Sequence, residues 1–254
     1  MINNRDVLRV ENYERSRGFV QTSHSWRMFM TNILRKIPLF AGLKDEELEA
    51  INNVTFVKKV PKDQVILLED EEGDTLFIIL EGKVKVSSYS ESGKEVIFSL
   101  LGGGDFFGDM SLLDGKTRSA SVVAVEDTKI QLIRRSDFYN IISEYPGIAM
   151  KLLGELASRI RKADDRIESL ALLDVTGRVA GILIELAEQR GKVCDDQVTI
   201  EARPTHQELA NMVGTTRETV TRVMKQLEMK DYIEVSGKDV TIISMEAFKK
   251  DLYL

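Results

Sequence analysis

The sequence predicts an α+β protein in which a jelly-roll-like β-roll is followed by a long helix and a winged helix-turn-helix. Three observations support this: β-branched runs broken by glycines from about residue 54, apolar residues at helical spacing after Pro146, and two capped short helices followed by a hairpin. The 254 residues therefore divide into an N-terminal extension 1–30, the β-roll 31–145, a dimerisation helix with its hinge 146–173, and the winged helix-turn-helix 174–254.

The composition excludes several classes of protein. No apolar run approaches the roughly 20 residues that span a membrane, and the N-terminus lacks the apolar core of a signal peptide. We therefore expect a cytoplasmic protein without a membrane partner. The single cysteine, Cys194, fits a reducing compartment and cannot form an internal disulfide. One cysteine and two histidines, His24 and His206, are too few ligands for an iron–sulfur cluster or a Cys/His zinc site, so no metal is expected.

The first 145 residues predict an extension and then an all-β unit. Residues 1–30 are polar and weakly periodic, which indicates a flexible or marginally helical extension. A short helix over 45–52 precedes the strands. Short runs of β-branched and aromatic residues with glycines between them are typical of a β-roll or barrel. These runs are "TFVKKV", "QVILLE", "TLFIILEGKVKVSSY", "EVIFSLL" and "ASVVAVEDTKIQLI".

The stretch "FFGDMSLLDGKTRSASVV", residues 106–123, places a carboxylate and an arginine a short loop apart. An arginine inside a β-roll is costly unless an anion meets it. A phosphate is therefore the expected partner of Arg118, and Ser119 offers a second donor. Gly108 has no Cβ and allows close backbone approach, while Asp109 can accept a hydrogen bond from a sugar hydroxyl. The residues alone leave open a structural salt bridge between Asp109 and Arg118.

After Pro146 the apolar residues follow a seam with steps of three, four, three, four and three. A helix packed on its own β-roll would also be apolar on one face. The narrowness of this stripe favours a parallel dimer helix, so we expect a homodimer. Asp174 has the character of an N-cap that opens a further helix, and 174–254 is expected to be mostly helical with a terminal hairpin. The seam residues are Leu153, Leu156, Ile160, Ala163, Ile167 and Leu170.

Two short helices joined by a glycine-containing turn predict a helix-turn-helix. Thr205 and Glu208 have the spacing of a capping box, and Gly214 ends the first helix. Either Thr215 or Thr216 caps the second helix. The run "YIEVSGKDVTII" then predicts a β-hairpin that forms the wing.

The second helix of this pair exposes side chains suited to DNA. Arginine can donate two hydrogen bonds to guanine and glutamate can accept one from cytosine, and such residues act from the first turns of a recognition helix. Polar residues around them suit phosphates. The residues alone leave open a solvated helix face with a Glu218–Arg222 pair. The expected DNA-contacting residues are Thr205, Gln207, Thr216, Arg217, Glu218, Thr219, Thr221, Arg222 and Lys238.

Three segments resemble the cyclic-AMP receptor protein/fumarate-nitrate regulator family of bacterial transcription regulators, in particular its cyclic-AMP receptor branch. "GDFFGDMSLLDGKTRSASV" resembles the phosphate-binding cassette of that family, "LALLDVTGRVA" resembles its hinge, and "GTTRETVTRVMKQLEMKDYI" with a following "GK" resembles its DNA-binding domain. The resemblance covers about residues 33–250. It implies a homodimeric regulator controlled by a cyclic nucleotide, with double-stranded DNA and RNA polymerase as partners.

The resemblance also implies roles for individual residues. Arg118 and Ser119 would hold the nucleotide phosphate, and Gly108 with Asp109 would hold the ribose 2′-hydroxyl. The base would lie at Ala163 and Asp164, where cyclic-AMP binders of the family have a Thr-Ser pair. Cyclic AMP is the first expectation, and cyclic GMP, cyclic di-GMP or ligand-independent binding stay open. The implied nucleotide-binding residues are Gly108, Asp109, Arg118, Ser119, Ala120, Ala163 and Asp164; Arg217, Glu218 and Arg222 match TGTGA-like operator half-sites.

No enzymatic activity is expected. Ser111, Ser119 and Ser121 have no histidine base near them in the sequence, and no nucleotide-triphosphate loop is present. The sequence therefore predicts a regulator rather than a catalyst.

Overall fold

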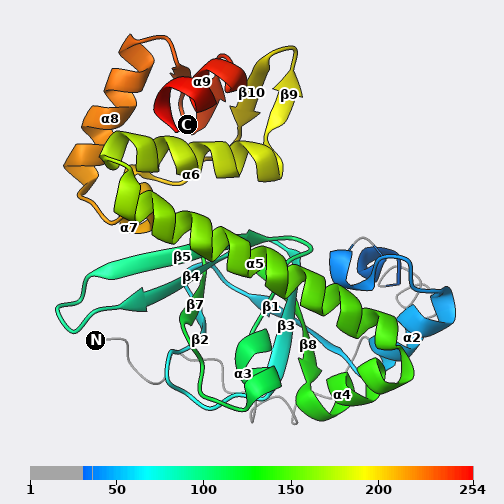
Figure 1. The fold of residues 1–254 in the computed structure, drawn as a ribbon. Helices are drawn as coiled ribbons and strands as arrows, with labels where there is room; N and C mark the ends of the chain where they lie inside the picture. Colours follow the sequence, from blue (N-terminus) through cyan, green and yellow to red (C-terminus); the bar gives the residue numbers. More distant parts are fainter. Residues whose placement is uncertain (1–30, 36, 254) are drawn as a thin grey trace. The chain divides into compact units, whose positions relative to one another are not determined.

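The computed structural model describes residues 31–35 and 37–253 (Figure 1). The predicted extension 1–30 lies outside the described residues. Within those residues, no helix combines the length and the apolar character needed to cross a membrane. The same part of the chain contains no cluster of histidine, cysteine and carboxylate side chains arranged to hold a metal ion.

The described residues form two compact units, which have separate hydrophobic cores. A β-roll with its flanking helices makes up most of the first unit, and a helical domain with a small sheet makes up most of the second. The first unit contains the described residues up to Gly93 together with Phe98–Ser158, and the second contains Lys94–Ile97 together with the described residues from Arg159 onward.

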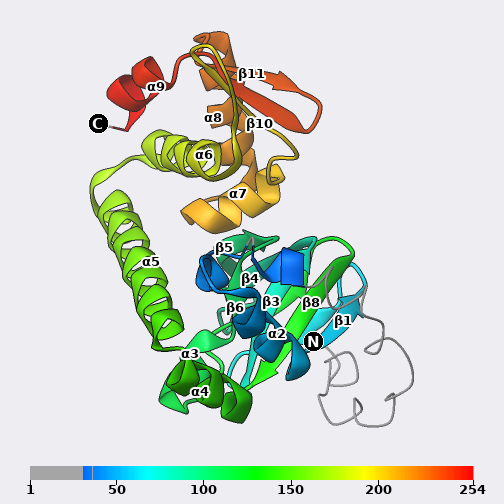
Figure 2. The same ribbon diagram turned by 90° about the vertical axis from the view of Figure 1, so that its right-hand side faces the viewer.

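The β-roll consists of two four-stranded sheets (Figures 1 and 2). One sheet has the strand order β1-β8-β3-β6 and the other has the order β2-β7-β4-β5. The predicted all-β region is therefore confirmed. Its strands are β1 Phe56–Val60, β2 Val65–Leu67, β3 Thr75–Glu81, β4 Lys83–Tyr89, β5 Glu95–Gly102, β6 Phe106–Phe107, β7 Ser121–Ala124 and β8 Thr128–Arg134.

Strand β3 shows why the first unit has two cores. Successive side chains of a strand point to opposite faces of the sheet. Leu76 and Ile78 accordingly pack with the flanking helices, whereas Phe77 packs inside the roll, where its ring stacks on that of Phe107 with centroids 5.0 Å apart. Both faces of β3 are thus covered, and a strand covered on both faces is apolar throughout, as "LFII" is.

Helices flank the roll on the Leu76 side. Among them, the expected helix over 45–52 is confirmed as α2, and the expected long helix after Pro146 is confirmed as α5. Helix α5 begins at Pro146 and buries Ile148 and Leu152 in the core of the first unit, with Leu156 packed against it. The first turns of α5 therefore dock on its own roll. The helical elements are η2 Pro38–Phe40, α2 Asp45–Asn53, α3 Asp109–Asp114, α4 Arg135–Glu144 and α5 Pro146–Leu172.

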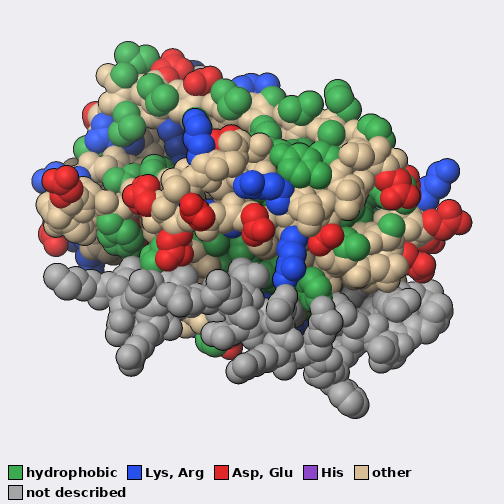
Figure 3. All heavy atoms as spheres, turned by 90° about the horizontal axis from the view of Figure 1, so that it is seen from below, with side chains coloured by type: hydrophobic (Ala, Val, Ile, Leu, Met, Phe, Trp, Pro, Cys, Tyr) green, Lys and Arg blue, Asp and Glu red, His purple; other side chains and the backbone are tan. Residues whose placement is uncertain are grey.

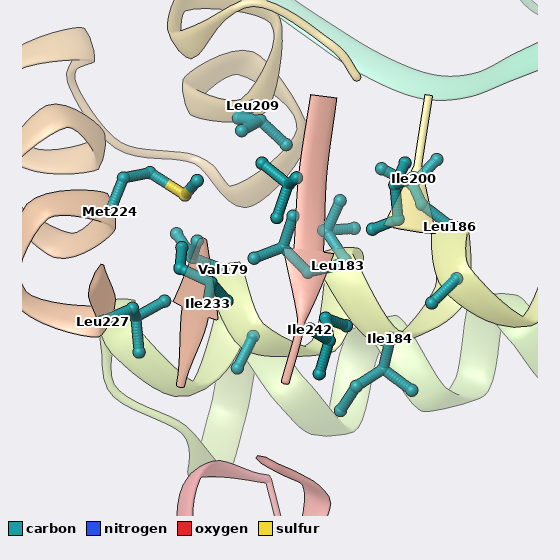
Figure 4. Close-up of a cluster of buried hydrophobic side chains, with 14 of the residues drawn as sticks. Val179, Leu183, Ile184, Leu186, Ile200, Leu209, Met224, Leu227, Ile233 and Ile242 are labelled. Carbon is teal, nitrogen blue, oxygen red and sulfur yellow. The ribbon is translucent and has the colours of Figure 1, made fainter. Parts of the chain in front are cut away.

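The second unit packs helices around a four-stranded sheet of order β11-β12-β10-β9. Figure 4 shows side chains of α6 and the sheet meeting those of the two helices that follow. Val179 and Leu183 of the first helix, Leu227 of the third and Ile242 of the sheet all belong to this core. The elements are α6 Val175–Arg190, β9 Lys192–Cys194, β10 Gln197–Ile200, α7 His206–Val213, α8 Arg217–Met229, β11 Ile233–Ser236, β12 Asp239–Ile242 and α9 Met245–Leu252.

The predicted helix boundaries of the second unit are confirmed by their caps. Asp174 accepts a hydrogen bond from the backbone of Gly177. Thr205 and Glu208 form a reciprocal capping box at the start of α7. Gly214 ends α7 in the left-handed conformation, with φ of +70°. Of the two candidate caps of α8, Thr216 is the one that accepts from a backbone N–H.

The prediction that 174–254 ends in a hairpin is wrong. The wing hairpin β11–β12 is present, but α9 follows it, capped by Ser244 and anchored by the fully buried Phe248. A second hairpin, β9–β10, was also missed. Helix α9 has eight residues, too few to show a clear period. All three residues of β9 are exposed, so β9 lacks the alternation that identifies a strand.

Candidate functional site

The guanidinium of Arg118 is buried in the first unit. The side chain is 5% exposed and belongs to the segment that leads into β7, rather than to the strand itself. Nη1 donates to the carbonyl of Gly108 at 2.9 Å and to Oγ of Ser111 at 2.5 Å, and Nη2 donates to the carbonyl of Thr75 at 3.0 Å. Nε has no hydrogen-bond partner. A guanidinium has five N–H donors, so the chain leaves part of this group for an external acceptor.

Two glycines give the guanidinium its space. A Cβ at residue 73 would lie 2.2 Å from Nε of Arg118. With Arg118 in this position, only glycine fits at residue 73. Gly108 has φ of +79°, and a Cβ there would lie 2.9 Å from Nη1 of Arg118 and 2.8 Å from the carbonyl oxygen of Thr75. The left-handed backbone and the close approach both require glycine at 108.

The surroundings leave the charge on Arg118 incompletely compensated. Burial lowers the pKa of Arg118 below its usual value, and repulsion from Arg135 acts in the same direction. Attraction from Asp74 and Asp109 opposes these effects without cancelling them. A net lowering of this pKa means that the site stabilises the charged form less than water does. A bound anion would reverse that balance.

The structure brings together part of the predicted nucleotide set. Gly108 and Asp109 lie at the start of α3, and Asp109 is 3% exposed. Ser119 is exposed, and its Oγ lies 3.4 Å from the sulfur of Met110. Ala120 is buried immediately before β7. The two residues predicted to meet the base, Ala163 and Asp164, are exposed on α5 and belong to the second unit.

Four residues around Arg118 were not predicted from the sequence. Gly73 and Thr75 line the guanidinium through their backbones, which no side-chain signal reveals. Ser111 accepts from Arg118 through Oγ and from Arg135 through its carbonyl, the latter at 2.5 Å from Nη2. Of these four residues, only Ser111 could have been suspected from the sequence, because it follows Asp109 by two residues.

In the second unit, α8 presents an exposed polar face. Arg217, Glu218 and Arg222 are all exposed in its first turns. Within the described part of the chain, no ion pair joins Glu218 to Arg222, so the alternative of a paired, solvated helix face is not supported. The side chains predicted to read bases are therefore available to a partner.

The residues predicted to contact phosphates surround that face. Thr205 and Thr216 are the caps of α7 and α8, so their hydroxyls also hold the helix ends. Thr219 is half-buried beside Thr216, and Gln207 is exposed, where it donates to Asn211. Lys238 is exposed in the turn of the wing hairpin.

One predicted DNA contact, Thr221, is already engaged inside the protein. Its hydroxyl donates to the carbonyl of Arg217 at 2.9 Å and lies 2.8 Å from Nδ1 of His206. Nε2 of His206 lies 3.3 Å from Nη2 of Arg203. Because arginine only donates, this network assigns an accepting Nε2 and a donating Nδ1, which is a neutral imidazole. His206 thereby joins α7 to α8.

This arrangement predicts acid sensitivity in the second unit. Burial, followed by repulsion from Arg203 and Arg217, lowers the pKa of His206 below 6.5. The unfolded chain then binds the proton more readily than the folded protein does. The stabilising contribution of neutral His206 is therefore complete above the unfolded pKa of about 6.5, and it is lost as the pH falls toward the folded pKa. We expect the unfolding midpoint of the second unit to fall more for wild type than for His206→Gln between about pH 7 and about pH 5. Thermal unfolding followed by circular dichroism checks this, and equal falls would refute it.

Comparisons with known proteins match both parts of the chain. Residues 57–145 match the cyclic nucleotide-binding domain, and residues 177–250 match the Crp-like helix-turn-helix domain. The CRP-like cAMP-activated global transcriptional regulator of Mycobacterium tuberculosis is 30% identical over 217 residues, which cover 85% of this chain and 97% of that protein. The cAMP-activated global transcriptional regulator CRP of Salmonella typhimurium is 34% identical over 199 residues, which cover 78% of this chain and 94% of that protein.

The fold is also shared with solved structures. The c-di-GMP responsive global regulator CLP of Xanthomonas campestris superimposes with a TM-score of 0.67 at 22% identity, covering 78% of this chain and 99% of that one. This likeness establishes the architecture of a β-roll, a long helix and a helix-turn-helix. The two domain matches, and the relatives of 30% and 34% identity over nearly their whole length, assign the chain to a family. The protein belongs to the CRP/FNR family of transcription regulators, as a DNA-binding regulator with a cyclic nucleotide-binding domain.

Proposed function

We propose that this chain is a homodimeric transcription regulator whose operator binding is controlled by a cyclic nucleotide, first of all cyclic AMP, held at Arg118. The observation that carries the proposal is the buried guanidinium, whose Nε lacks a partner and which lies against two glycines. The relatives from Mycobacterium tuberculosis and Salmonella typhimurium are both described as cAMP-activated, which supports cyclic AMP as the effector.

The residues around Arg118 fit a cyclic nucleotide. A cyclic phosphate carries one negative charge and several acceptor oxygens. One of these oxygens can accept the hydrogen bond from Nε of Arg118, which has no partner within the protein. Ser119 is exposed beside it and can donate to the same phosphate. Asp109 at the start of α3 can accept a hydrogen bond from the ribose 2′-hydroxyl. Each of these roles uses a group that the structure places on the segments adjoining Arg118.

The exposed stripe of α5 supports a dimer. In Figure 3 hydrophobic side chains follow one another along the upper edge of the face shown. Leu156 packs on the β-roll, but the other large seam residues are between 58% and 66% exposed: Leu153, Ile160, Ile167 and Leu170. A heptad-spaced apolar stripe of this kind is buried when two copies pair through the same helix.

The dimer proposal predicts the effect of charged residues in the seam. Changing Ile160 and Ile167 to aspartate should raise the dimer dissociation constant by at least about 1000-fold, because each buried isoleucine contributes about 1.5–3 kcal/mol. Lys162→Asp, exposed on the polar face of the same helix, should leave the dimer intact. Sedimentation equilibrium of the three proteins measures this. An unchanged dimer in the double variant would show that the copies pair elsewhere, or not at all.

A dimer would place two recognition helices on one face of the duplex. Such dimers read two half-sites about one helical turn apart, so the operator repeats the two-fold symmetry of the protein. Arg217, Glu218 and Arg222 are exposed and correspond to the residues expected for TGTGA-like half-sites. We therefore propose a palindromic operator with these half-sites.

The identity of the base is the open part of the proposal. Ala163 cannot donate or accept a hydrogen bond, whereas Asp164 can accept either from the amino group of adenine or from N1–H and N2–H₂ of guanine. Both residues are exposed on α5. This favours a test that includes guanine nucleotides as well as cyclic AMP.

Calorimetric titration with cyclic AMP, cyclic GMP and cyclic di-GMP tests the function. We expect cyclic AMP to bind, and operator gel shifts to require it. Tighter binding of a guanine nucleotide would keep the regulatory mechanism and replace the effector. If none of the three binds and the operator is bound equally without them, the chain is a ligand-independent regulator.

A further inference from the structure

Ser111 contacts both arginines of the candidate nucleotide site with two different oxygens. Its Oγ accepts from Nη1 of Arg118 and its carbonyl accepts from Nη2 of Arg135, each at 2.5 Å. The side chain lies on α3 and is 2% exposed. Ser111 is thus held in place through its main chain while its hydroxyl occupies one terminal nitrogen of Arg118.

The hydroxyl of Ser111 faces the group that an incoming phosphate needs. Hydrogen bonds between a guanidinium and a phosphate are strong because both partners are charged. The same positive charge strengthens the hydrogen bond from Nη1 of Arg118 to Oγ of Ser111. The Ser111 hydroxyl therefore competes with a phosphate for Nη1. The other acceptors of Arg118 are backbone carbonyls of Gly108 and Thr75, which no substitution removes. Ser111 is the one side-chain acceptor recorded for Arg118 among the described residues.

Arg135 holds the backbone of Ser111 in place. Its Nη2 also approaches the carbonyl of Gly73, at 3.4 Å, so that Arg135 links α3 to the loop that packs against the Arg118 guanidinium. Ser111 cannot shift with its backbone unless this link opens. The bond between Ser111 and Arg118 must then be given up when another acceptor takes Nη1.

We propose that the Ser111 hydroxyl is an internal place-holder that competes with the nucleotide phosphate for Nη1 of Arg118 and so sets the affinity of the site. This inference rests on the proposed function, because it concerns the same anion site. It makes Ser111 a positioning residue that acts on the ligand through Arg118. Removing its hydroxyl therefore has opposite effects on the ligand-free protein and on nucleotide affinity.

Ser111→Ala tests the place-holder directly. It should bind cyclic AMP about tenfold more tightly in calorimetry, the scale of one charge-assisted hydrogen bond. At the same time its ligand-free unfolding midpoint should fall, because Arg118 loses an internal partner. Ser111→Thr keeps a hydroxyl and should restore both values. Ser87→Ala is the matched control: Ser87 is fully buried and its Oγ has no hydrogen-bond partner, so the nucleotide affinity should not change and the unfolding midpoint should not fall.

The outcomes separate this inference from the proposed function. If wild type binds cyclic AMP and Ser111→Ala binds it equally or less tightly, the hydroxyl does not compete and the place-holder is refuted while the site stands. If neither wild type nor the variants bind any of the three cyclic nucleotides, the proposed function fails and the place-holder fails with it. If Ser111→Ala does not fold, Ser111→Gly and Ser111→Thr replace it in the test. Wild-type affinity in Ser111→Thr together with tighter binding in Ser111→Gly supports the place-holder. Wild-type affinity in both variants refutes it.

Discussion

Arg118→Leu is expected to abolish cyclic-nucleotide binding while leaving a folded dimer. Leucine is similar in bulk to the buried stem of arginine but cannot donate to a phosphate. Removing one partner of a buried charge pair costs about 2–5 kcal/mol, so affinity should fall by at least about 30-fold. The dimer should persist because the exposed stripe of α5 lies outside this site.

The Arg118 experiment needs two controls. Lys116→Leu removes an exposed positive charge two residues away and should bind nucleotide normally. Arg118→Lys keeps the charge but loses the forked donor geometry, so it should bind weakly rather than not at all. Calorimetry gives the affinity, and sedimentation gives the oligomeric state. Wild-type nucleotide binding by a folded Arg118→Leu dimer would place the nucleotide elsewhere.

Arg222→Ala should lose sequence preference while keeping most non-specific DNA binding. Arg222 is exposed in the second turn of α8 and has no ion-pair partner in the described part of the chain. A bidentate contact between arginine and guanine contributes about 1–3 kcal/mol of discrimination against the wrong base. The preference for the half-site guanine should therefore shrink by that amount.

Lys225→Ala is the matched control for Arg222, since Lys225 is exposed one turn further along the same helix. Loss of a phosphate contact weakens binding to all sequences alike and reduces the salt dependence. Anisotropy competition with the operator and with single-base variants of its half-sites separates the two effects. An equal loss on every sequence for Arg222→Ala would identify that side chain as a phosphate contact.

The parts of the fold that the sequence predicted are those set by local chemistry. Asp174, Thr205 and Thr216 bond to backbone groups within three residues, so their type and spacing suffice to locate a helix start. Gly214 marks the end of α7 for an equally local reason, its positive φ. Alternating apolar residues identified the strands for the same reason.

The parts that were missed depend on contacts between distant segments. Thr75 lies 43 residues from Arg118 in the sequence and meets it through a carbonyl, which carries no residue-type signal. Gly73 gives the guanidinium its space only after the chain has folded. Helix α9 is fixed by burial of Phe248 against the second unit rather than by its own period. Sequence reasoning thus found Arg118 but not the residues that hold it.

A nucleotide can control operator binding only through contacts that differ between the two states of the protein. In the proposed mechanism Arg118 supplies such a contact, because a bound phosphate meets donors that its internal acceptors leave unused. Helix α5 runs from the β-roll unit into the second unit and ends just before Asp174, the cap of α6. A change at the roll therefore has a continuous element along which to act.

The most direct test of this coupling is the affinity of wild type for a labelled palindromic TGTGA operator, measured by fluorescence anisotropy with and without saturating cyclic AMP. Allosteric couplings typically change affinity by about 5–150-fold. We predict an increase in this range for wild type and none for Arg118→Leu. Equal operator affinity of wild type in the presence and absence of the nucleotide would contradict control through Arg118.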